Sequence, residues 1–363
     1  MGVVGLGGMG AADLDALLGM DGVTVRCVCD VNRAKAYAAR ERVDRHYGSR
    51  VCVAEADYRA VCERPDLDAV VIATPDHTHA AVGLSAAAGG KDIYGEPPFT
   101  HTLREGRELV EAVARGGRVY QAGSWQRSQT TFRHASDVVR EGALGRLARV
   151  EVGLPGGGRG PSGGTCSAAV RQSGLDGRAA CDYHWRWVSA WGGGTLAEWI
   201  GHYGDTALWG AGLEETGPVR VEGAGEFPSD GLYDTATSFA FECLFGNGLV
   251  LAVADGGRLE KGVGVRWIGQ SGEWLWVTRG GVEASSPETL REIARRSGKG
   301  EPSGCGAALA RHLRNFIDCV RTRETAWAPA ESAHRAASLS HLGDLAMRSG
   351  RVVSFDPRSE RVL

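Results

Sequence analysis

One short segment carries acid-base side chains at helical spacing. Glu198, His202 and Asp205 stand at positions i, i+4 and i+7 of the run 195–205. In an α-helix this spacing places the three side chains along one face. Imidazole titrates near neutral pH, so His202 is the candidate base, and Glu198 is the carboxylate that would orient it. Two plainer interpretations stay open: His202 as a core histidine, and Thr195-x-x-Glu198 as a capping box at a helix N-terminus.

A glycine-rich turn near the start predicts a phosphate-binding element. It reads Gly5-Leu6-Gly7-Gly8-Met9-Gly10, after a β-type run and before a helix. In this context the first glycine permits the tight turn, the second lets the backbone approach a pyrophosphate, and the third lets helix and strand pack. Asp30 ends the next β-type run, placed to accept hydrogen bonds from both adenosine ribose hydroxyls. Its carboxylate favours NAD over NADP, but Arg33 could pair with a 2′-phosphate and keeps NADP open.

The elements that must position these residues alternate in the first third of the chain. Strands are expected at residues 2–5, 23–30, 69–74, 92–95 and 118–122, and helices at 13–18, 33–47, 79–88 and 103–114. Alternating strands and helices predict a doubly wound parallel sheet, an α/β Rossmann domain, over residues 1–123.

The texture changes after residue 123. Strands are expected at residues 147–154, 233–245, 248–254, 262–269 and 274–278, a glycine-rich loop at 156–164, and helices near 195–210, 307–321 and 331–349. Successive strands without crossover helices predict an α+β domain over residues 124–363 with an open, mostly antiparallel sheet. The C-terminal helices could pack back on the Rossmann domain.

Composition narrows the range of partners. With 43% hydrophobic and 23% charged residues and a net charge of −3, the chain offers no field for nucleic acid or an anionic membrane. Its apolar runs are far shorter than the roughly 20 residues of a membrane helix. Nine cysteines without a C-x-x-C pair or zinc-site spacing indicate reduced thiols, no metal and the cytoplasm. The first strand is short, so the natural N-terminus could lie upstream, and export is not excluded.

The motifs together resemble the glucose-fructose oxidoreductase / inositol dehydrogenase (Gfo/Idh/MocA) family. Besides the glycine turn, the resemblance rests on the runs 73–79 (ATPDHTH), 91–96 (KDIYGE), 192–194 (GGG) with His202, and 315–320 (NFIDCV). It implies an NAD(P)-dependent oxidoreductase that acts on a small carbohydrate, a sugar or a polyol. It also implies a subunit interface on the open sheet, so a homodimer or homotetramer is expected.

The resemblance assigns roles on the cofactor side, with one departure. The family's segment after the β-strand 69–74 runs beside the cofactor, which makes Thr74, Pro75, His77 and His79 candidate contacts. The next loop of the family holds a Glu-Lys-Pro triplet whose lysine assists proton transfer, but this chain reads Glu96-Pro97-Pro98. Glu96 stays a candidate cofactor contact, whereas proline can neither donate nor accept a proton.

On the substrate side, the resemblance makes His202 and the carboxylate at 198 the pair that contacts substrate hydroxyls. Asp205, Trp187, Gln126 and Arg127 are further expected substrate contacts. The alternatives are core packing for the tryptophan and structural contacts for the polar residues.

Three functions fit these residues. The first is a sugar or polyol dehydrogenase with His202 as base. The second is a glycosidase that oxidises its sugar transiently, eliminates and returns the hydride, a type of relative that also lacks the lysine. The third is a non-catalytic protein that binds dinucleotide or sugar.

Overall fold

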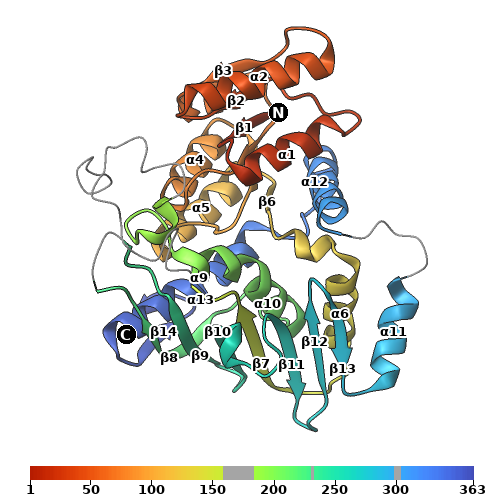
Figure 1. Ribbon diagram of the computed structural model, residues 1–363, viewed down its shortest axis with the longest axis vertical. Helices are drawn as coiled ribbons and strands as arrows, with labels where there is room; N and C mark the ends of the chain where they lie inside the picture. The colour runs from red at the N-terminus through yellow and green to blue at the C-terminus, as the bar shows by residue number, and fades with distance from the viewer. Residues whose placement is uncertain (158–183, 230–232, 298–303) are drawn as a thin grey trace. The chain divides into compact units, whose positions relative to one another are not determined.

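The computed structural model describes residues 1–157, 184–229, 233–297 and 304–363. The chain forms two compact units, one of residues 1–128 and 304–330 and the other of residues 129–303 and 331–363 (Figure 1). Most of the glycine-rich loop expected at 156–164 lies outside the described residues. None of the helices in the described part of the chain has the length and apolarity needed to cross a membrane.

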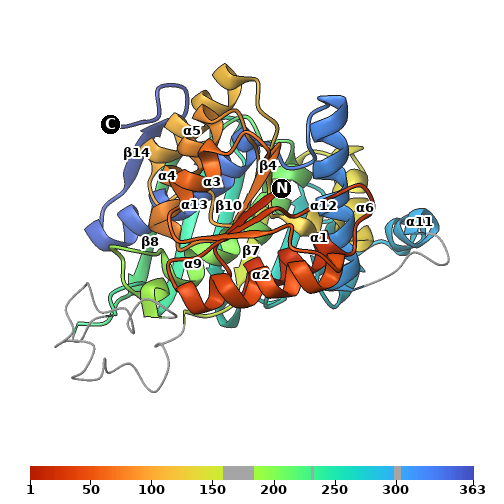
Figure 2. The same ribbon diagram turned by 90° about the horizontal axis from the view of Figure 1, so that it is seen from above.

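The first unit contains a parallel six-stranded sheet in the order β3-β2-β1-β4-β5-β6, as described. Its strands are β1 (Gly2–Val4), β2 (Cys27–Cys29), β3 (Val53–Glu55), β4 (Ala69–Ile72), β5 (Asp92–Gly95) and β6 (Tyr120–Ala122). Its helices are α1 (Gly8–Leu18), α2 (Arg33–Tyr47), α3 (Tyr58–Glu63), α4 (Asp76–Ala88), α5 (Leu103–Gly116) and α12 (Cys305–Thr322). Helices α1, α2 and α12 cover one face and α3, α4 and α5 the other (Figure 2). The predicted doubly wound fold is confirmed.

Helices cover both faces of the parallel sheet, and this explains why most of its strands could be recognised in the sequence. Every residue of β1, β2, β4 and β5 is buried, so these strands read as unbroken apolar runs. The predicted strand 23–30 is longer than the observed Cys27–Cys29. Strand β3 and helix α3 are missing from the prediction, because β3 lies at the sheet edge with exposed or half-buried side chains and α3 is only six residues long.

Helix α12 returns to the first unit from far along the chain. Its apolar face, with Leu313 and Phe316 fully buried, joins the core formed by Leu14 and Leu17 of α1. The Gln121 side chain donates to the His312 carbonyl oxygen at 2.5 Å. This helix therefore completes the layer that packs beside α1.

The second unit contains a nine-stranded sheet among its described residues, in the order β13-β12-β11-β7-β10-β9-β8-β14-β15. The strands are β7 (Leu147–Leu154), β8 (Pro218–Glu226), β9 (Ser238–Phe245), β10 (Val250–Asp255), β11 (Gly264–Gly269), β12 (Trp274–Thr278), β13 (Gly281–Ala284), β14 (Val353–Asp356) and β15 (Arg361–Val362). Only the β7–β10 pair is parallel in this set. The predicted, mostly antiparallel sheet is confirmed, although β8, β13, β14 and β15 were not foreseen.

Helices pack on this sheet through glycines that face aromatic rings. A Cβ on Gly210 of α10 (Asp205–Ala211) would lie 2.5 Å from the Trp267 indole of β11. A Cβ on Gly343 of α13 (Ala330–Ser349) would lie 2.5 Å from the Phe241 ring of β9. Each glycine thus admits a large ring, and burying one such phenylalanine contributes about 1.5–3 kcal/mol.

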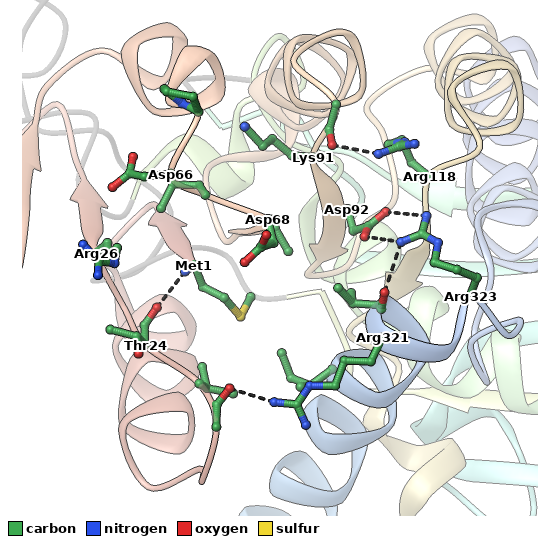
Figure 3. A pocket seen from close by; sticks show the side chains of 18 residues that line it. Met1, Thr24, Arg26, Asp66, Asp68, Lys91, Asp92, Arg118, Arg321 and Arg323 are labelled. Carbon is green, nitrogen blue, oxygen red and sulfur yellow. Dashed lines mark hydrogen bonds and ion pairs between the residues drawn. The ribbon is translucent and has the colours of Figure 1, made fainter.

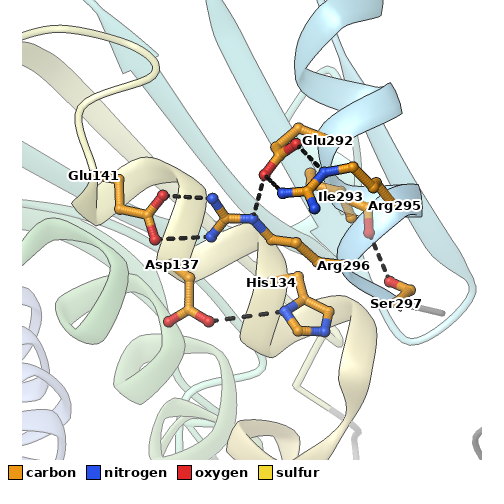
Figure 4. A network of polar contacts seen from close by, with 8 residues as sticks. All are labelled: His134, Asp137, Glu141, Glu292, Ile293, Arg295, Arg296 and Ser297. Carbon is orange, nitrogen blue, oxygen red and sulfur yellow. Dashed lines mark hydrogen bonds and ion pairs between the residues drawn. The ribbon is translucent and has the colours of Figure 1, made fainter.

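A charged network ties α11 (Pro287–Ser297) to α6 (Thr130–Arg140), two helices that the sequence analysis missed (Figure 4). Arg296 donates to both carboxylate oxygens of Glu141, at 2.5 and 2.8 Å, and to Glu292 at 2.7 Å. Hydrogen bonds from Arg295 and Arg296 lower the pKa of Glu292 to about 2. The network lies on the surface and has the character of a structural tether.

Candidate functional site

The glycine turn between β1 and α1 has a geometry that only glycine allows. Gly5 has φ +90, and a Cβ there would lie 2.4 Å from the Ala73 carbonyl oxygen. A Cβ on Gly10 would lie 1.9 Å from the Gly5 carbonyl oxygen. The first glycine therefore makes the turn and the third lets helix α1 lie against it.

The start of α1 fits a pyrophosphate. Gly7 is the N-cap of the helix and offers no side-chain cap, so the first N–H groups have no intrahelical partner. A Cβ on Gly7 or Gly8 would meet nothing within 4 Å in the described structure, so open space lies in front of these amides. Free N–H groups, the positive end of a helix dipole and open space form an anion cradle. Leu6 and Met9 complete the predicted turn, and Met9 is exposed.

Asp30 has a second role that the sequence did not reveal. Its Oδ2 accepts from the Leu6 N–H and its Oδ1 from the Asn32 N–H, both at 2.8 Å. Each carboxylate oxygen retains acceptor capacity for a ribose hydroxyl. Asp30 thus fixes the glycine turn to the start of α2, where Asn32 caps the helix and Arg33 is exposed.

The segment after β4 contains four predicted cofactor contacts, and the structure brings only some of them together. Pro75 is the N-cap of α4, and the Thr78 hydroxyl donates to its carbonyl oxygen at 2.8 Å. His79 is buried, with one ring nitrogen 2.6 Å from the Thr74 carbonyl oxygen and the other 2.6 Å from the Pro98 carbonyl oxygen. His77 is exposed on α4.

Glu96 is buried in the first unit, where it interacts with Asp13, a residue that the sequence analysis did not identify. A Cβ on Gly123 would lie 2.3 Å from Glu96 Oε1, so the carboxyl packs against that backbone. Burial, reinforced by the charge of Asp13, raises the pKa of Glu96 well above its ordinary value. Burial also raises the pKa of Asp13, on α1, to about 8. The two carboxyls form a buried acidic pair under the glycine turn's helix.

Gln126 and Arg127 are buried in the short helix η1 (Trp125–Ser128). Arg127 donates through Nη1 to the Trp327 carbonyl oxygen at 2.7 Å. This bond lies within the first unit and supports the structural interpretation of Arg127.

The helix expected at 195–210 is interrupted. It consists of α9 (Gly194–Trp199), a π-helical turn η3 (Ile200–Gly204) and α10, so Glu198, His202 and Asp205 do not share one regular α-helical face. The wider turn, often found at functional sites, carries His202. Gly193 is the N-cap of α9 and no side chain caps it, so the capping box at Thr195 does not form.

Charged and aromatic side chains of the second unit make a series of contacts near Glu198 and His202 in the sequence. Arg186 of η2 (His184–Trp187) pairs with Glu198 at 3.3 Å. Within the same unit, His184 hydrogen-bonds to the Tyr233 hydroxyl, and Trp187 meets the Tyr233 ring edge-on at 5.9 Å. The His202 ring meets Trp199 edge-on at 6.0 Å, whereas Asp205 is only 1% exposed. A carboxylate-guanidinium pair, an imidazole and aromatic rings could bind a ligand with hydroxyl groups.

The first unit contains a cavity of about 770 Å³ at the end of its sheet opposite the glycine turn (Figure 3). Residues at or just before the starts of β1, β2, β4 and β5 line it, whereas the glycine turn follows the carboxyl end of β1. Three of its cations make contacts within the unit: Lys91 donates to the Arg64 carbonyl oxygen, Arg321 donates to that of Gly22, and Arg323 pairs with Asp92. This cavity is not the dinucleotide cradle.

Comparison with known proteins also indicates a dinucleotide-binding domain at the start of the chain. Residues 1–124 match the family described as "Oxidoreductase family, NAD-binding Rossmann fold". The chain is 34% identical over 92 residues to a levoglucosan dehydrogenase of Pseudarthrobacter phenanthrenivorans, which covers 25% of this chain and 24% of the relative. It is 32% identical over 145 residues to the scyllo-inositol 2-dehydrogenase (NAD(+)) of Bacillus subtilis, covering 40% and 41%. It is 33% identical over 118 residues to a glycosyl hydrolase family 109 protein of Streptomyces filamentosus, covering 32% and 24%. The alignments thus span less than half of each of these relatives.

Solved structures match over nearly the whole chain. The WlbA dehydrogenase from Bordetella pertussis, in complex with NADH and UDP-GlcNAcA, has a TM-score of 0.72 at 16% identity and covers 98% of this chain and 97% of its own. A levoglucosan dehydrogenase in complex with NADH has a TM-score of 0.71 at 19% identity and covers 97% and 98%. At this identity the likeness shows the shared fold. Residues 1–124 thus match the NAD-binding Rossmann domain of an oxidoreductase family, and the rest of the chain shares the fold of the solved dehydrogenases.

Proposed function

We propose that the protein is an NAD-dependent oxidoreductase that acts on a hydroxyl group of a sugar or polyol. The observation that carries the proposal is the cradle at the start of α1, with amides facing open space and a turn that admits only glycine at Gly5 and Gly10. The names of the relatives, a levoglucosan dehydrogenase and an inositol dehydrogenase, point to the substrate class.

Residues of the second unit supply the chemistry that the substrate needs. Bound NAD accepts a hydride from the carbon that bears the hydroxyl group, and a base must take the hydroxyl proton. We assign that proton to the imidazole of His202. The carboxylate of Glu198, held by Arg186 at 3.3 Å, is available to accept a hydrogen bond from a second hydroxyl. Trp187 and Trp199 offer flat apolar surfaces to a sugar ring.

The test replaces His202 with alanine and follows two signals in the same wells. Purified protein, NAD and a panel of free sugars, inositols and aryl glycosides are monitored for nicotinamide absorbance and aglycone release. Loss of the base should lower turnover by about 10²–10⁴-fold while the Kd for NAD stays unchanged. His46→Ala, at an exposed position on α2, is the matched control. Unchanged turnover in His202→Ala would remove His202 from the proposal.

Pro97 favours a second candidate function, an NAD-recycling glycosidase. The chain lacks the lysine of the family triplet at this position, and one of its relatives is a glycosyl hydrolase family 109 protein. In the same panel, aglycone release without net NADH would establish this candidate in place of the dehydrogenase. Silence in both signals would favour a binding protein.

A lysine at position 97 separates the two candidates further. Pro97 is half-buried, so a longer side chain has a route to solvent. If the protein is a dehydrogenase, Pro97→Lys should raise kcat about tenfold or more, because a second proton carrier joins His202. Thermal unfolding and the Kd for NAD serve as controls. Unchanged kcat in a folded, NAD-binding variant would contradict this role for the missing ammonium.

A further inference from the structure

His79 is a buried histidine whose two ring nitrogens both face carbonyl oxygens. It is 3% exposed, with Nδ1 2.6 Å from the Pro98 oxygen and Nε2 2.6 Å from the Thr74 oxygen. A carbonyl oxygen can only accept a hydrogen bond. A neutral imidazole carries one N–H, so its other nitrogen would direct a lone pair at an oxygen lone pair at hydrogen-bond distance. Only the doubly protonated ring satisfies both contacts.

His312 in the same unit provides an internal comparison. Its Nδ1 lies 2.7 Å from the Ser128 hydroxyl and its Nε2 lies 2.7 Å from the Ala122 carbonyl oxygen. A serine hydroxyl can donate, so the neutral ring with a proton on Nε2 satisfies both contacts. Two buried histidines of one unit are therefore expected in different protonation states.

We propose that His79 is an imidazolium in the folded protein and acts as a positioning residue for the dinucleotide site. Its two N–H groups join the Thr74 carbonyl, which follows β4, to the Pro98 carbonyl, which follows β5. Hydrogen bonds from a charged donor are shorter and stronger than neutral ones, in keeping with both 2.6 Å contacts. The cation thus fixes two segments at the carboxyl ends of adjacent strands, where ligands of α/β sheets bind.

Asp76 supplies a carboxylate near this charge. Asp76 is buried three residues earlier on α4, a spacing that places both side chains on one face of the helix. Glu96, just before Pro97 and Pro98, is held protonated because burial raises its pKa. The N-terminal dipole of α4 opposes a cation, and Asp76 in the first turn offsets it.

The His79 contact also gives a role to Pro98 in the Glu96-Pro97-Pro98 sequence. Where the family places an ammonium group, this chain has a proline, and the carbonyl oxygen of the next residue, Pro98, accepts a hydrogen bond from the His79 ring. The proposal deepens the dinucleotide site and does not depend on the substrate. Its tests therefore use NAD binding and spectroscopy, and neither requires an active enzyme.

Nitrogen NMR of the full chain, labelled with ¹⁵N-histidine, tests the protonation state directly. Both His79 nitrogens should show the chemical shift of protonated nitrogen from pH 6.5 to 8.5, whereas His312 should show one protonated and one unprotonated nitrogen. The variants His79→Gln and His312→Gln assign the signals. A His79 ring with one unprotonated nitrogen at pH 7 would overturn the proposal.

NAD affinity tests the positioning role. In a folded His79→Gln variant, one amide group cannot reach both carbonyls, and the Kd for NAD should rise about tenfold; His46→Gln, exposed on α2, should leave it unchanged. An unchanged Kd in folded His79→Gln would overturn the positioning role. If that variant fails to fold, the ¹⁵N spectrum of the wild-type protein decides, with its signals assigned by selective labelling.

Discussion

Replacing Asp13 with asparagine should stabilise the protein, and the gain should grow as the pH rises. Asp13 is 0% exposed on α1, and neither carboxylate oxygen has a hydrogen-bond partner in the described structure. A buried charge without a partner is costly, and an amide of the same shape carries none. Glu96 beside it makes the charged form costlier still. The substitution therefore removes a group whose ionisation is favourable in the unfolded chain and unfavourable in the fold.

The sign of the pH dependence follows from the direction of the shift. Burial raises the pKa of Asp13 from 3.8 to about 8, so the folded protein retains this proton at pH values where the unfolded chain has lost it. The contribution of Asp13 to stability is therefore complete below about pH 4 and declines as the pH rises to about 8. One proton accounts for at most about 1.4 kcal/mol per pH unit in this interval.

Thermal unfolding at pH 5 and pH 8.5 measures the effect. Asp13→Asn should unfold at least several degrees above the wild-type protein at pH 8.5, at about 2–4 °C per kcal/mol, and the difference should shrink at pH 5. Asp15→Asn is the matched control, because Asp15 lies on the same helix, is exposed and pairs with Arg42 on the surface. An equal gain at both pH values would mean that ionisation of Asp13 is not the cause.

Local signals account for the parts of the fold that could be predicted. Helix α2 was predicted with its observed bounds, Arg33–Tyr47, because the residues on either side mark them: Asn32 caps the N-terminus and Gly48, with φ +64, ends the helix. The buried strands were visible as apolar runs. Strand β3 and helix α3 gave no such signal, since few of their residues are buried.

The candidate site also has parts that the sequence could predict and parts that it could not. The conformation of the glycine turn could be predicted because it depends on residue type and spacing, whereas its contact with a pyrophosphate and that of Asp30 with a ribose stay predictions. The Asp13–Glu96 pair could not, because the fold brings together residues that are far apart in the sequence. The π-helical turn at His202 was also hidden, since the apolar spacing of 195–210 suits a regular helix; a histidine between Gly201 and Gly204 was the available hint.

The second glycine of the turn separates binding from folding. Gly7 has φ −73 and ψ −159, which alanine adopts without strain, and a Cβ there would meet nothing within 4 Å. Gly7→Ala should therefore leave the free energy of unfolding unchanged or raise it by up to about 1 kcal/mol. The same methyl group would occupy the space through which a pyrophosphate approaches the backbone. The Kd for NAD should rise at least tenfold, which corresponds to about 1.4 kcal/mol.

Calorimetric titration with NAD and thermal unfolding of three variants test this assignment. Gly8→Ala, also in open space, is the matched control and should lose less affinity, because Gly8 is not one of the three motif glycines. Gly10→Ala should lose both stability and binding, because its Cβ would overlap the Gly5 carbonyl oxygen at 1.9 Å. If Gly7→Ala binds NAD as tightly as the wild-type protein, the phosphates do not approach this turn, and the open space before α1 has another use.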